Sequence, residues 1–371
     1  MLLRRKLSFA LFIAAILFLM LASQSINKRH FLPVSLTLPT IWATGASRDS
    51  VVGLTEAPAD LTNDDAEATP PPSMNQPKTK EEPKITSKQR SCGCSKTCIS
   101  DLGTSSWFTQ RYNPKMQPII RKNGNNFDPN SLKWWLGLQH SGNGQNLEDV
   151  LSKLFQVISP PTMDFSPLPT VCRKCAVVGN SGNLRLHEYG SQIDSHSYVM
   201  RMNKAVTRGF EKHVGNRTTH HLIYPESAVD IEPGVNLVLL PFKVRDLEWL
   251  TSAFSTGEIK MTYMRVKDRL VADTDKVMVL NPTFFKYVHD HWNENHGRYP
   301  STGMLAIIFA LHICDEVSVF GYGANEQGHW HHYWENNRDA GAFRKTGVHS
   351  GDFEAQVIQQ LNKEGKITLY L

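Results

Sequence analysis

The segment CRKCAVVGNSGNLRLHEYGSQIDSHSYVMRMNKA, Cys172–Ala205, combines two apolar runs with a glycine-rich turn. Ala176–Val178 is predicted to be a short buried strand, and Gly179–Asn183 the turn after it. A helix can begin at Leu184, and Tyr198–Met202 is predicted to be a second strand. A strand, a glycine turn, a helix and a strand in this order typically place a nucleotide at the carboxyl ends of parallel strands.

The same pattern returns near the end of the chain. Ser301-Thr302-Gly303 caps a predicted helix from Met304 to Cys314, which is apolar on nearly every side and is therefore expected to be buried. The strand Val317–Phe320 follows and ends in Gly321-Tyr322-Gly323. Two further strands are predicted at Asn236–Leu240 and Lys276–Leu280. Alternating strands and helices favour an α/β fold with a mainly parallel sheet.

The N-terminus predicts a membrane segment. Arg4, Arg5 and Lys6 precede the uncharged run LSFALFIAAILFLMLA, residues 7–22. At ~1.5 Å per residue this run spans roughly 24 Å, which suits a thin early-secretory bilayer. The flanking cations predict a cytosolic tail over residues 1–6 and a retained signal anchor over 7–22, with everything after it luminal. Cleavage of a signal peptide, followed by secretion, is the alternative.

A stem and a folded body are expected after the anchor. Residues 23–90 include an acidic polar stretch and then Pro70–Pro72, in a segment with little apolar material to pack, so we expect a disordered luminal stem. Residues 91–371 form the predicted catalytic or binding domain. The net charge is +5, but residues 1–90 carry 11 Lys and Arg against 8 Asp and Glu, and residues 91–371 carry 29 against 27. A nearly neutral body argues against a nucleic-acid partner.

The cysteines agree with a luminal body. A CxxC pair alone would also suit zinc or a redox centre, but six cysteines behind a signal anchor favour three disulfides, among 15 pairings that the sequence leaves open. They are Cys92, Cys94, Cys98, Cys172, Cys175 and Cys314. Asn216-Arg217-Thr218 is a glycosylation sequon, whereas Pro282 excludes the one at Asn281.

Two predicted strand ends and one helix start are candidates for anion binding. Asn180 and Asn203 follow equivalent strands, where their amides can donate to phosphate or ribose oxygens. Backbone N–H groups of the turn after Val178 can also meet an anion, although many such turns bind nothing. Ser301-Thr302-Gly303 adds a second helix N-terminus, for which plain N-capping is the alternative.

The histidines are a sharper signal. His329, His331 and His332 lie in a polar and aromatic patch, and His349 is followed five residues later by Glu354. Zinc is disfavoured because adjacent histidines seldom share one metal and the cysteines are taken by disulfides. A histidine beside a nucleotide pocket can act as a general base near neutral pH.

Asp273-Thr274-Asp275 is similar to a metal-binding DxD motif, but its polar surroundings favour a charged turn before the next strand.

These segments, in this order, resemble the motifs of animal sialyltransferases. Cys172–Ala205 is similar to the large sialyl motif, and HGRYPSTGMLAIIFALHICDEVSVFGYGA, His296–Ala324, to the small motif. His332–Glu335 resembles the third motif and His349 with Glu354 the very small motif. The HHYWENN, AGAFRKTGVH and HGRYPSTG stretches most resemble the β-galactoside α2,3-sialyltransferases that act on Galβ1-3GalNAc.

The resemblance implies an activity and a location. Sialic acid would pass from CMP-sialic acid to the 3-hydroxyl of the terminal galactose in Galβ1-3GalNAc glycans of glycoproteins and glycolipids, with inversion. It also implies a GT-A-like single Rossmann-type domain, a type II Golgi membrane protein, and no metal or other cofactor. The donor leaves as CMP, which has no diphosphate to chelate. Formation of a homodimer is left open.

The resemblance also assigns residues. His349 would be the general base and His332 would lie near the donor phosphate. The disulfides implied are Cys175–Cys314, Cys94–Cys172 and Cys92–Cys98. Two alternatives remain: a sialic-acid-binding lectin on this fold would not need His349, and a metal-dependent transferase would need Asp273 and Asp275. The donor-binding residues implied are Asn180, Asn203, Ser301, Thr302, Gly303 and Gly323, and the acceptor-binding candidates are Tyr263, Tyr299 and Gln139.

Overall fold

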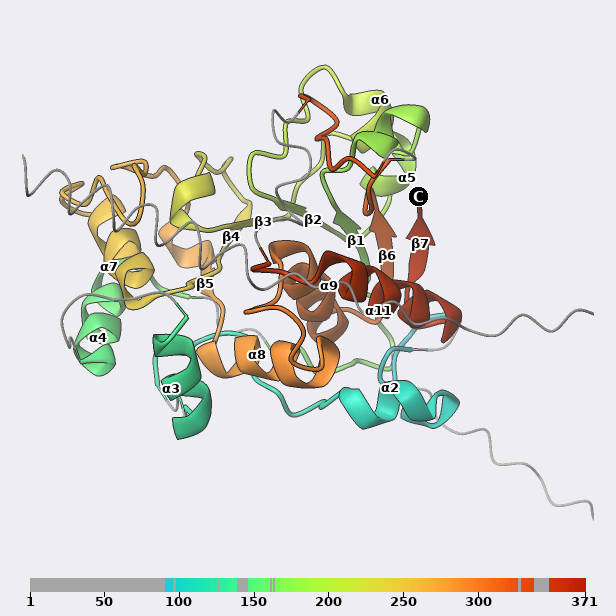
Figure 1. Cartoon of the computed structure of the whole chain (residues 1–371), viewed down its shortest axis with the longest axis horizontal. Coiled ribbons are helices and arrows are strands. Elements are labelled where there is room, and N and C mark those ends of the chain that lie inside the picture. The colour runs from blue at the N-terminus through green and yellow to red at the C-terminus, as the bar shows by residue number, and fades with distance from the viewer. Residues whose placement is uncertain are drawn as a thin grey trace, which may run out of the picture. The chain divides into compact units, whose positions relative to one another are not determined.

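A parallel sheet is the centre of the folded body (Figure 1). The computed structural model describes residues 91–371 except 96–97, 124, 126, 139–145, 161, 163, 326–327 and 337–346. The predicted tail, anchor and stem lie outside the described residues. The strands of the described part are β1 Lys174–Val178, β2 Tyr198–Met202, β3 His220–Ile223, β4 Asn236–Leu239, β5 Val277–Val279, β6 Glu316–Phe320 and β7 Thr368–Tyr370.

Helices alternate with these strands along the chain. The described α-helices are α2 Ser106–Arg111, α3 Pro129–Leu136, α4 Leu147–Val157, α5 Gly190–Asp194, α6 Glu211–Val214, α7 Val244–Ala253, α8 Pro282–Tyr287, α9 Thr302–Ile313 and α11 Gly351–Lys363. Short 3-10 helices lie at η1 Leu102–Thr104, η2 Gly182–Leu186, η3 Pro225–Ser227 and η4 Thr274–Lys276, and η5 Val288–Trp292 is a π-helix.

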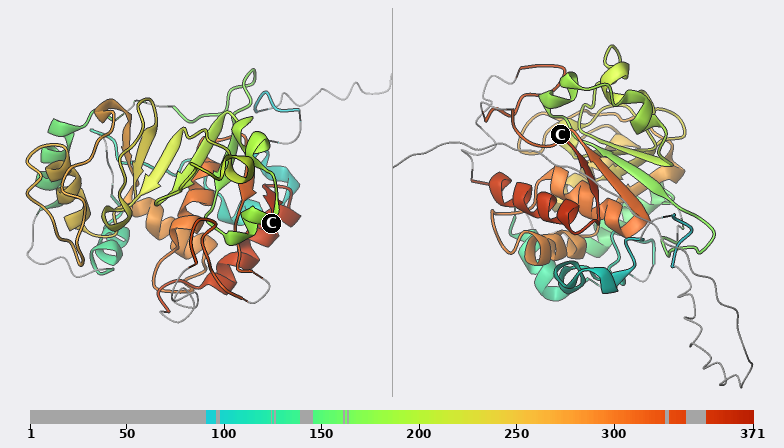
Figure 2. Two further views of the ribbon diagram at one scale, coloured as in Figure 1. Left: turned by 90° about the horizontal axis from the view of Figure 1, so that it is seen from above. Right: turned by 90° about the vertical axis from the view of Figure 1, so that its right-hand side faces the viewer.

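Helices cover both faces of the sheet, as the right-hand view of Figure 2 shows. Val177 and Met200 point to one face, where they share a core with α8, α9 and α11. Leu237 and Leu239 point to the other face and pack with α4 and α7. Nearer β6, that second face is covered by α5 and α6. Alternate residues of each strand are therefore buried on opposite faces, as expected for strands of a parallel sheet covered on both sides.

The strand order contains one reversal. The order is β5-β4-β3-β2-β1-β6-β7, and each neighbouring pair is parallel. The chain therefore moves from β1 toward β5 and then returns to the other side of β1. In open parallel sheets, ligands bind beyond the carboxyl ends of the strands at such a reversal. The segments after β1 and β6 therefore mark the expected site.

The predicted strands agree with the observed ones, but the helix expected from Leu184 is divided. The η2 helix ends at Leu186, His187 is extended, and α5 begins only at Gly190. Gly190 packs so closely on α6 that a Cβ atom there would lie 2.0 Å from the carbonyl oxygen of Glu211. Two short helices, not one continuous helix, therefore connect β1 to β2.

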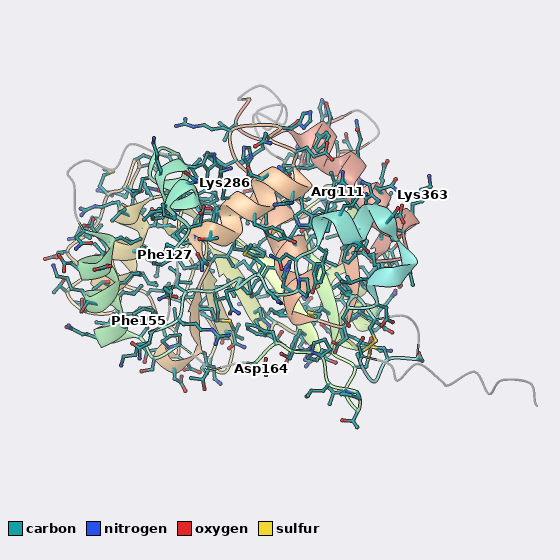
Figure 3. The ribbon with its side chains drawn as sticks, turned by 90° about the horizontal axis from the view of Figure 1, so that it is seen from below. Arg111, Phe127, Phe155, Asp164, Lys286 and Lys363 are labelled. Atoms are coloured by element: carbon teal, nitrogen blue, oxygen red, sulfur yellow. A yellow bond between two sulfur atoms is a disulfide. The ribbon has the colours of Figure 1, made fainter. Side chains whose placement is uncertain are left out.

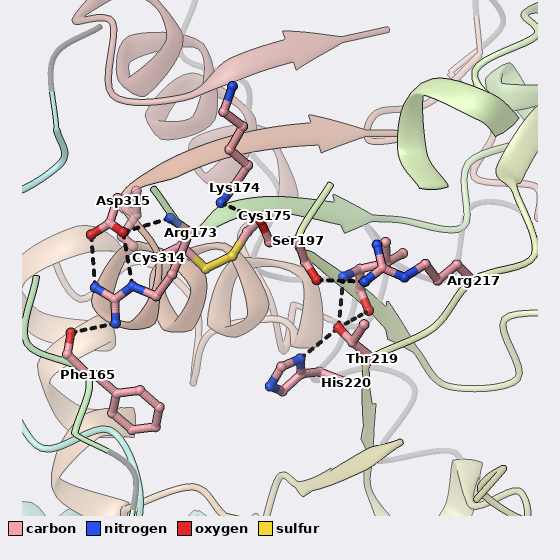
Figure 4. The surroundings of a disulfide bond; sticks show 12 residues. Phe165, Arg173, Lys174, Cys175, Ser197, Arg217, Thr219, His220, Cys314 and Asp315 are labelled. Atoms are coloured by element: carbon pink, nitrogen blue, oxygen red, sulfur yellow. Dashed lines mark hydrogen bonds and ion pairs between the residues drawn. A yellow bond between two sulfur atoms is a disulfide. The ribbon is translucent and has the colours of Figure 1, made fainter. Parts of the chain in front are cut away.

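Three disulfides link the described cysteines in the pairs that the resemblance implies: Cys92–Cys98, Cys94–Cys172 and Cys175–Cys314. Cys175 lies on β1 and Cys314 caps the end of α9, so their bond ties this helix to the central strand (Figure 4). Beside it, Asp315 accepts hydrogen bonds from Arg173 Nε at 3.0 Å and Nη2 at 2.8 Å. These bonds raise the pKa of Arg173.

None of the helices in the described part of the chain has both the length and the apolar character needed to span a bilayer. The apolar run at residues 7–22 lies outside that part.

Candidate active site

A cavity of about 760 Å³ opens at the carboxyl edge of the sheet, at the reversal of strand order. Residues from both long motifs, from the histidine-rich segment and from α11 line it. Gln139 lies outside the described residues, and Tyr299 contacts the lining without belonging to it. Of the catalytic, donor and acceptor residues expected from the sequence, the cavity brings together His349, His332, Asn180, Asn203, Ser301, Thr302, Gly303, Gly323 and Tyr263.

The turn after β1 is held against the turn after β6. The backbone N–H of Gly179 donates to Phe320 O at 2.8 Å, and Ser181 Oγ donates to Gly323 O at 2.8 Å. A Cβ atom at Gly179 would lie 2.3 Å from Gly321 O, so only glycine fits. The two glycine turns therefore form one backbone floor for the cavity.

Two asparagines close the ends of β1 and β2. Asn180 Nδ2 donates to Met202 O at 3.1 Å, while the buried Oδ1 atoms of Asn180 and Asn203 find no hydrogen-bond partner among the described residues. Asn203 adopts a left-handed φ of 60°, which asparagine tolerates better than most residues. Since a buried acceptor without a partner is costly, both oxygens are suited to accept from a ligand hydroxyl or amino group. For Asn180 this Oδ1 atom adds an acceptor to the donor role toward phosphate or ribose oxygens that the sequence predicts.

The N-terminus of α9 forms another wall, and a buried carboxylate fixes it. Ser301 Oγ caps the helix by accepting from Met304 N at 3.1 Å. Glu354, which is 4% exposed, accepts from Ser301 N at 2.8 Å, from Ser301 Oγ at 2.5 Å and from Asn293 Nδ2 at 2.9 Å. The first-turn N–H groups of Thr302 and Gly303 consequently keep a fixed direction beside the cavity.

His349 is oriented by a backbone carbonyl. Its Nδ1 lies 2.9 Å from Tyr299 O, and its ring meets the Tyr299 ring edge-on at 5.1 Å. A carbonyl only accepts, so Nδ1 carries the proton and the neutral ring has its lone pair on Nε2. Glu354, five residues later, accepts from Ser301 and thereby fixes the start of α9. The two residues of the very small motif thus have separate tasks.

The histidine-rich segment lies across the first glycine turn. Gly182 N donates to His331 O at 2.8 Å, and Tyr333 N donates to Asn180 O at 3.0 Å. His332, between them, stacks on Trp334 at 4.4 Å and places Nδ1 3.2 Å from Glu335 Oε1. The hydrogen bond with His332 lowers the pKa of Glu335. An imidazole is thereby held beside the backbone floor.

The far end of the cavity is built by tyrosines above a buried ion cluster. Tyr224 follows β3 and lines the cavity with Tyr263. Below them, Lys243 Nζ lies 3.1 Å from Glu226 Oε1 and 2.7 Å from Asp246 Oδ1. The three charged side chains are no more than 5% exposed. Tyr263 is 65% exposed overall, but partial burial of its hydroxyl and the nearby Glu226 carboxylate raise its pKa to about 12, so the hydroxyl stays protonated near neutral pH.

Two other places in the described residues are weaker candidates for a functional site. A second cavity of about 240 Å³ includes Arg111 and Lys286, both labelled in Figure 3, but these cations pair with Glu294 and Asp290. Among the described residues, the grouped potential metal ligands are Cys94, Cys172 and Glu316, of which the cysteines form a disulfide. Asp273 precedes η4, where its side chain accepts from Gly234 N at 2.7 Å, and it does not line the main cavity.

Residues 119–366 match the model of glycosyltransferase family 29, the sialyltransferases. The chain belongs to this family. It is 53% identical over 281 residues to CMP-N-acetylneuraminate-beta-galactosamide-alpha-2,3-sialyltransferase 2 of Rattus norvegicus, covering 76% of this chain and 80% of that protein. It is 50% identical over 283 residues to the corresponding sialyltransferase 1 of Gallus gallus, covering 76% and 82%.

Solved structures agree with the family. The crystal structure of a mammalian sialyltransferase superposes with a TM-score of 0.70 at 47% identity, covering 76% of this chain and 99% of that one. A second, the complex of a mammalian sialyltransferase with Gal-beta-1-3GalNAc-ortho-nitrophenol, gives 0.69 at 46% identity, covering 75% and 98%.

Sequence reasoning missed part of the sialyltransferase cavity. Tyr224 follows β3, and functional residues of parallel sheets often follow strands. This strand was not predicted, because it begins with two histidines, so Tyr224 was missed. The ion cluster of Glu226, Lys243 and Asp246 gave no signal, because ordinary charged residues on a loop and a helix look alike whether they are exposed or buried.

Proposed function

We propose that this chain transfers sialic acid from CMP-sialic acid to the 3-hydroxyl of galactose in Galβ1-3GalNAc-terminated glycans of glycoproteins and glycolipids, with inversion. The relatives at about half identity carry this kind of activity in their names. The observation that supports it most is His349, whose Nδ1 is bound to Tyr299 O at 2.9 Å in a cavity that also holds two glycine turns and a helix N-terminus.

The proposed reaction is a single displacement. The galactose 3-oxygen attacks the anomeric carbon of sialic acid, and its proton passes to Nε2 of His349. The bond between that carbon and the phosphate oxygen breaks, and its electron pair leaves with CMP. Because attack and departure take place on opposite sides of the carbon, the configuration inverts. A base in this position typically contributes about 10²–10⁴-fold to the rate.

The leaving phosphate would lie near His332 and the first turn of α9. A protonated His332 donates from both ring nitrogens, one to Glu335 and one to the phosphate. The amide groups of Thr302 and Gly303 add fixed partial positive charge. Asn180 Oδ1 and Asn203 Oδ1 would accept from hydroxyl or amino groups of the nucleotide. Tyr263 and Tyr299, with Gln139, would contact the acceptor.

Four further proposals follow from the sequence. The reaction needs no metal, since the leaving group is a monophosphate held by hydrogen-bond donors. Residues 7–22 anchor the chain in the Golgi membrane with the catalytic domain in the lumen, after a stem over residues 23–90. Asn216, which is exposed, carries a glycan in that compartment. The sheet belongs to the GT-A-like class.

The test is an assay of the full chain with CMP-sialic acid and a panel of free galactosides, scored for linkage with an α2,3-specific sialidase. We expect transfer to Galβ1-3GalNAc, with and without EDTA. His349→Ala should lose about 10²–10⁴ of the rate while CMP binding, measured by calorimetry, is retained. His291→Ala changes an exposed histidine outside this cavity and is the matched control.

Three results would contradict the proposal. Full activity of His349→Ala would remove this residue as the base. Donor binding by the parent chain without any transfer would favour the lectin. Loss of transfer in EDTA that Mn²⁺ restores would favour a metal-dependent enzyme.

A further inference from the structure

One exposed hairpin borders the tyrosine end of the cavity. Residues 260–266 turn back on themselves through a bridge between Met261 and Arg265, with Thr262 N donating to Met264 O at 3.0 Å and Val266 N to Lys260 O at 3.1 Å. Its tip exposes large side chains: Met261 is 55%, Tyr263 65% and Met264 49% exposed. Lys260 and Arg265, both exposed, flank that tip. We name residues 260–266 the tip hairpin.

The buried ion cluster anchors the tip hairpin. Thr262 Oγ1 donates to Glu226 Oε1, which also pairs with Lys243. Lys243 Nζ in turn lies 5.0 Å from the centre of the Tyr263 ring. At the base, Val266 is buried in the core that contains α4 and α7. A loop with this anchoring holds its exposed methionines in place, so their exposure is a fixed property of the surface.

The position of the tip hairpin points to the acceptor. Tyr263 lines the cavity that His349 also lines, at the end away from the glycine turns. In the complex proposed below, a glycan whose terminal galactose reaches His349 extends outward past this side, so that the group attached to its reducing end meets Met261 and Met264.

The chemistry of the tip hairpin fits a lipid surface better than a peptide. Apolar side chains flanked by two cations suit the boundary between acyl chains and anionic headgroups. A peptide that binds as an added strand would need free backbone hydrogen-bonding groups on the protein. In the tip hairpin, Thr262 N, Met264 O, Val266 N and Lys260 O are already bonded to one another.

Building on the proposed transferase activity, we propose that the tip hairpin docks on the lipid bilayer that presents a glycolipid acceptor. Met261 and Met264 enter the interface and Lys260 and Arg265 contact anionic headgroups. This docking places a membrane-borne Galβ1-3GalNAc group at the tyrosine end of the cavity.

The test compares three acceptors carrying the same disaccharide: the free disaccharide, a glycopeptide, and a glycolipid in phosphatidylcholine vesicles with or without phosphatidylserine. The full chain is used throughout, so every variant keeps the same N-terminal segment. The double variant Met261→Ser/Met264→Ser should lose about tenfold or more in kcat/KM on vesicles, and less than about twofold on the free disaccharide and the glycopeptide. Lys260→Gln/Arg265→Gln should remove most of the gain from phosphatidylserine.

Leu168→Ser is the matched control, because Leu168 is 53% exposed and does not line the cavity. An equal loss on all three acceptors would overturn the proposal, as the tip hairpin would then act on the disaccharide itself. A loss confined to the glycopeptide would identify a peptide surface instead, and unchanged rates on vesicles would exclude docking. Failure of the parent chain on every acceptor would contradict the transferase activity, a result separate from these.

Discussion

The two ends of the cavity are built by different means. At the strand reversal, the backbone of two glycine turns and of the α9 N-terminus makes the surface, and hydrogen bonds between the turns hold it. The Cys175–Cys314 disulfide joins β1 to α9 at the opposite ends of these two elements. At the tyrosine end, side chains from Tyr224 and Tyr263 make the surface, and buried ion pairs hold it. A surface made of backbone atoms fits a narrow range of ligands, whereas the shape of a surface made of side chains can change with a few substitutions. We therefore expect the donor to be recognised at the first end and acceptor selectivity to arise at the second.

The largest effect at the strand-reversal end of the cavity, which we call the backbone end, is expected from substitution of Glu354. Glu354→Gln replaces one carboxylate oxygen with a donor, so Ser301 loses an acceptor and the α9 N-terminus is released. Loss of a buried hydrogen bond to a charged group typically changes an equilibrium or rate constant by roughly 10–100-fold. We therefore expect kcat/KM to fall by about that factor, with a raised donor KM. Steady-state kinetics against CMP-sialic acid measure it.

The control for this change is Glu364→Gln at the end of the same helix, where the carboxylate accepts from Gln360 and does not line the cavity. A lower yield of active enzyme with an unchanged donor KM would mean that Glu354 acts on folding alone. Such a result would also weaken the distinction between the two ends.

A paired substitution separates the two ends directly. Asn180→Ala removes an acceptor at the end of β1 and should raise the donor KM about tenfold with little change in acceptor KM. Glu226→Gln loosens the ion cluster below Tyr263 and should raise the acceptor KM, leaving the donor KM within about twofold. Measuring both KM values for each variant gives the comparison.

Asn236→Ala is a matched control for the asparagine. Its Nδ2 donates to Thr219 O at 3.1 Å, the same kind of bond that Asn180 makes, but it lies at the amino end of β4. If Asn180→Ala raised the acceptor KM more than the donor KM, its assignment to the donor would be wrong.

The sequence predicted the backbone end well because its determinants are local. A glycine that must fit under another backbone, as Gly179 does against Gly321 O, is visible in the sequence as a conspicuous turn after an apolar strand. The N-cap at Ser301 is equally local. Strand pairing then brings Asn180 and Asn203 together without further information, because parallel neighbours end at the same edge.

The tyrosine end depends on contacts between distant segments. Glu226 lies in a short turn, Lys243 caps α7 and Thr262 belongs to the tip hairpin, so nothing in their spacing indicates that they meet. The role of Glu354 was hidden for a similar reason, since its partner Ser301 is 53 residues away. Tyr263 entered the prediction only through the family resemblance.

The smallest expected effect concerns stability and should leave both ends unchanged. His220 lies at the amino end of β3, away from the cavity edge, and burial lowers its pKa to about 4. The unfolded chain binds a proton at this residue near the ordinary value of 6.5, so stability rises with pH between about 4 and 6.5 and is lost as pH falls through that window. This residue alone should cost about 2 kcal/mol between pH 7 and pH 5. Urea unfolding of the parent and of His220→Gln at both values measures the difference. The variant should lose less stability on acidification.

An identical pH dependence in the two chains would show that another group controls acid stability. A change in either KM at pH 7 would show that the sheet transmits strain from this histidine to the cavity.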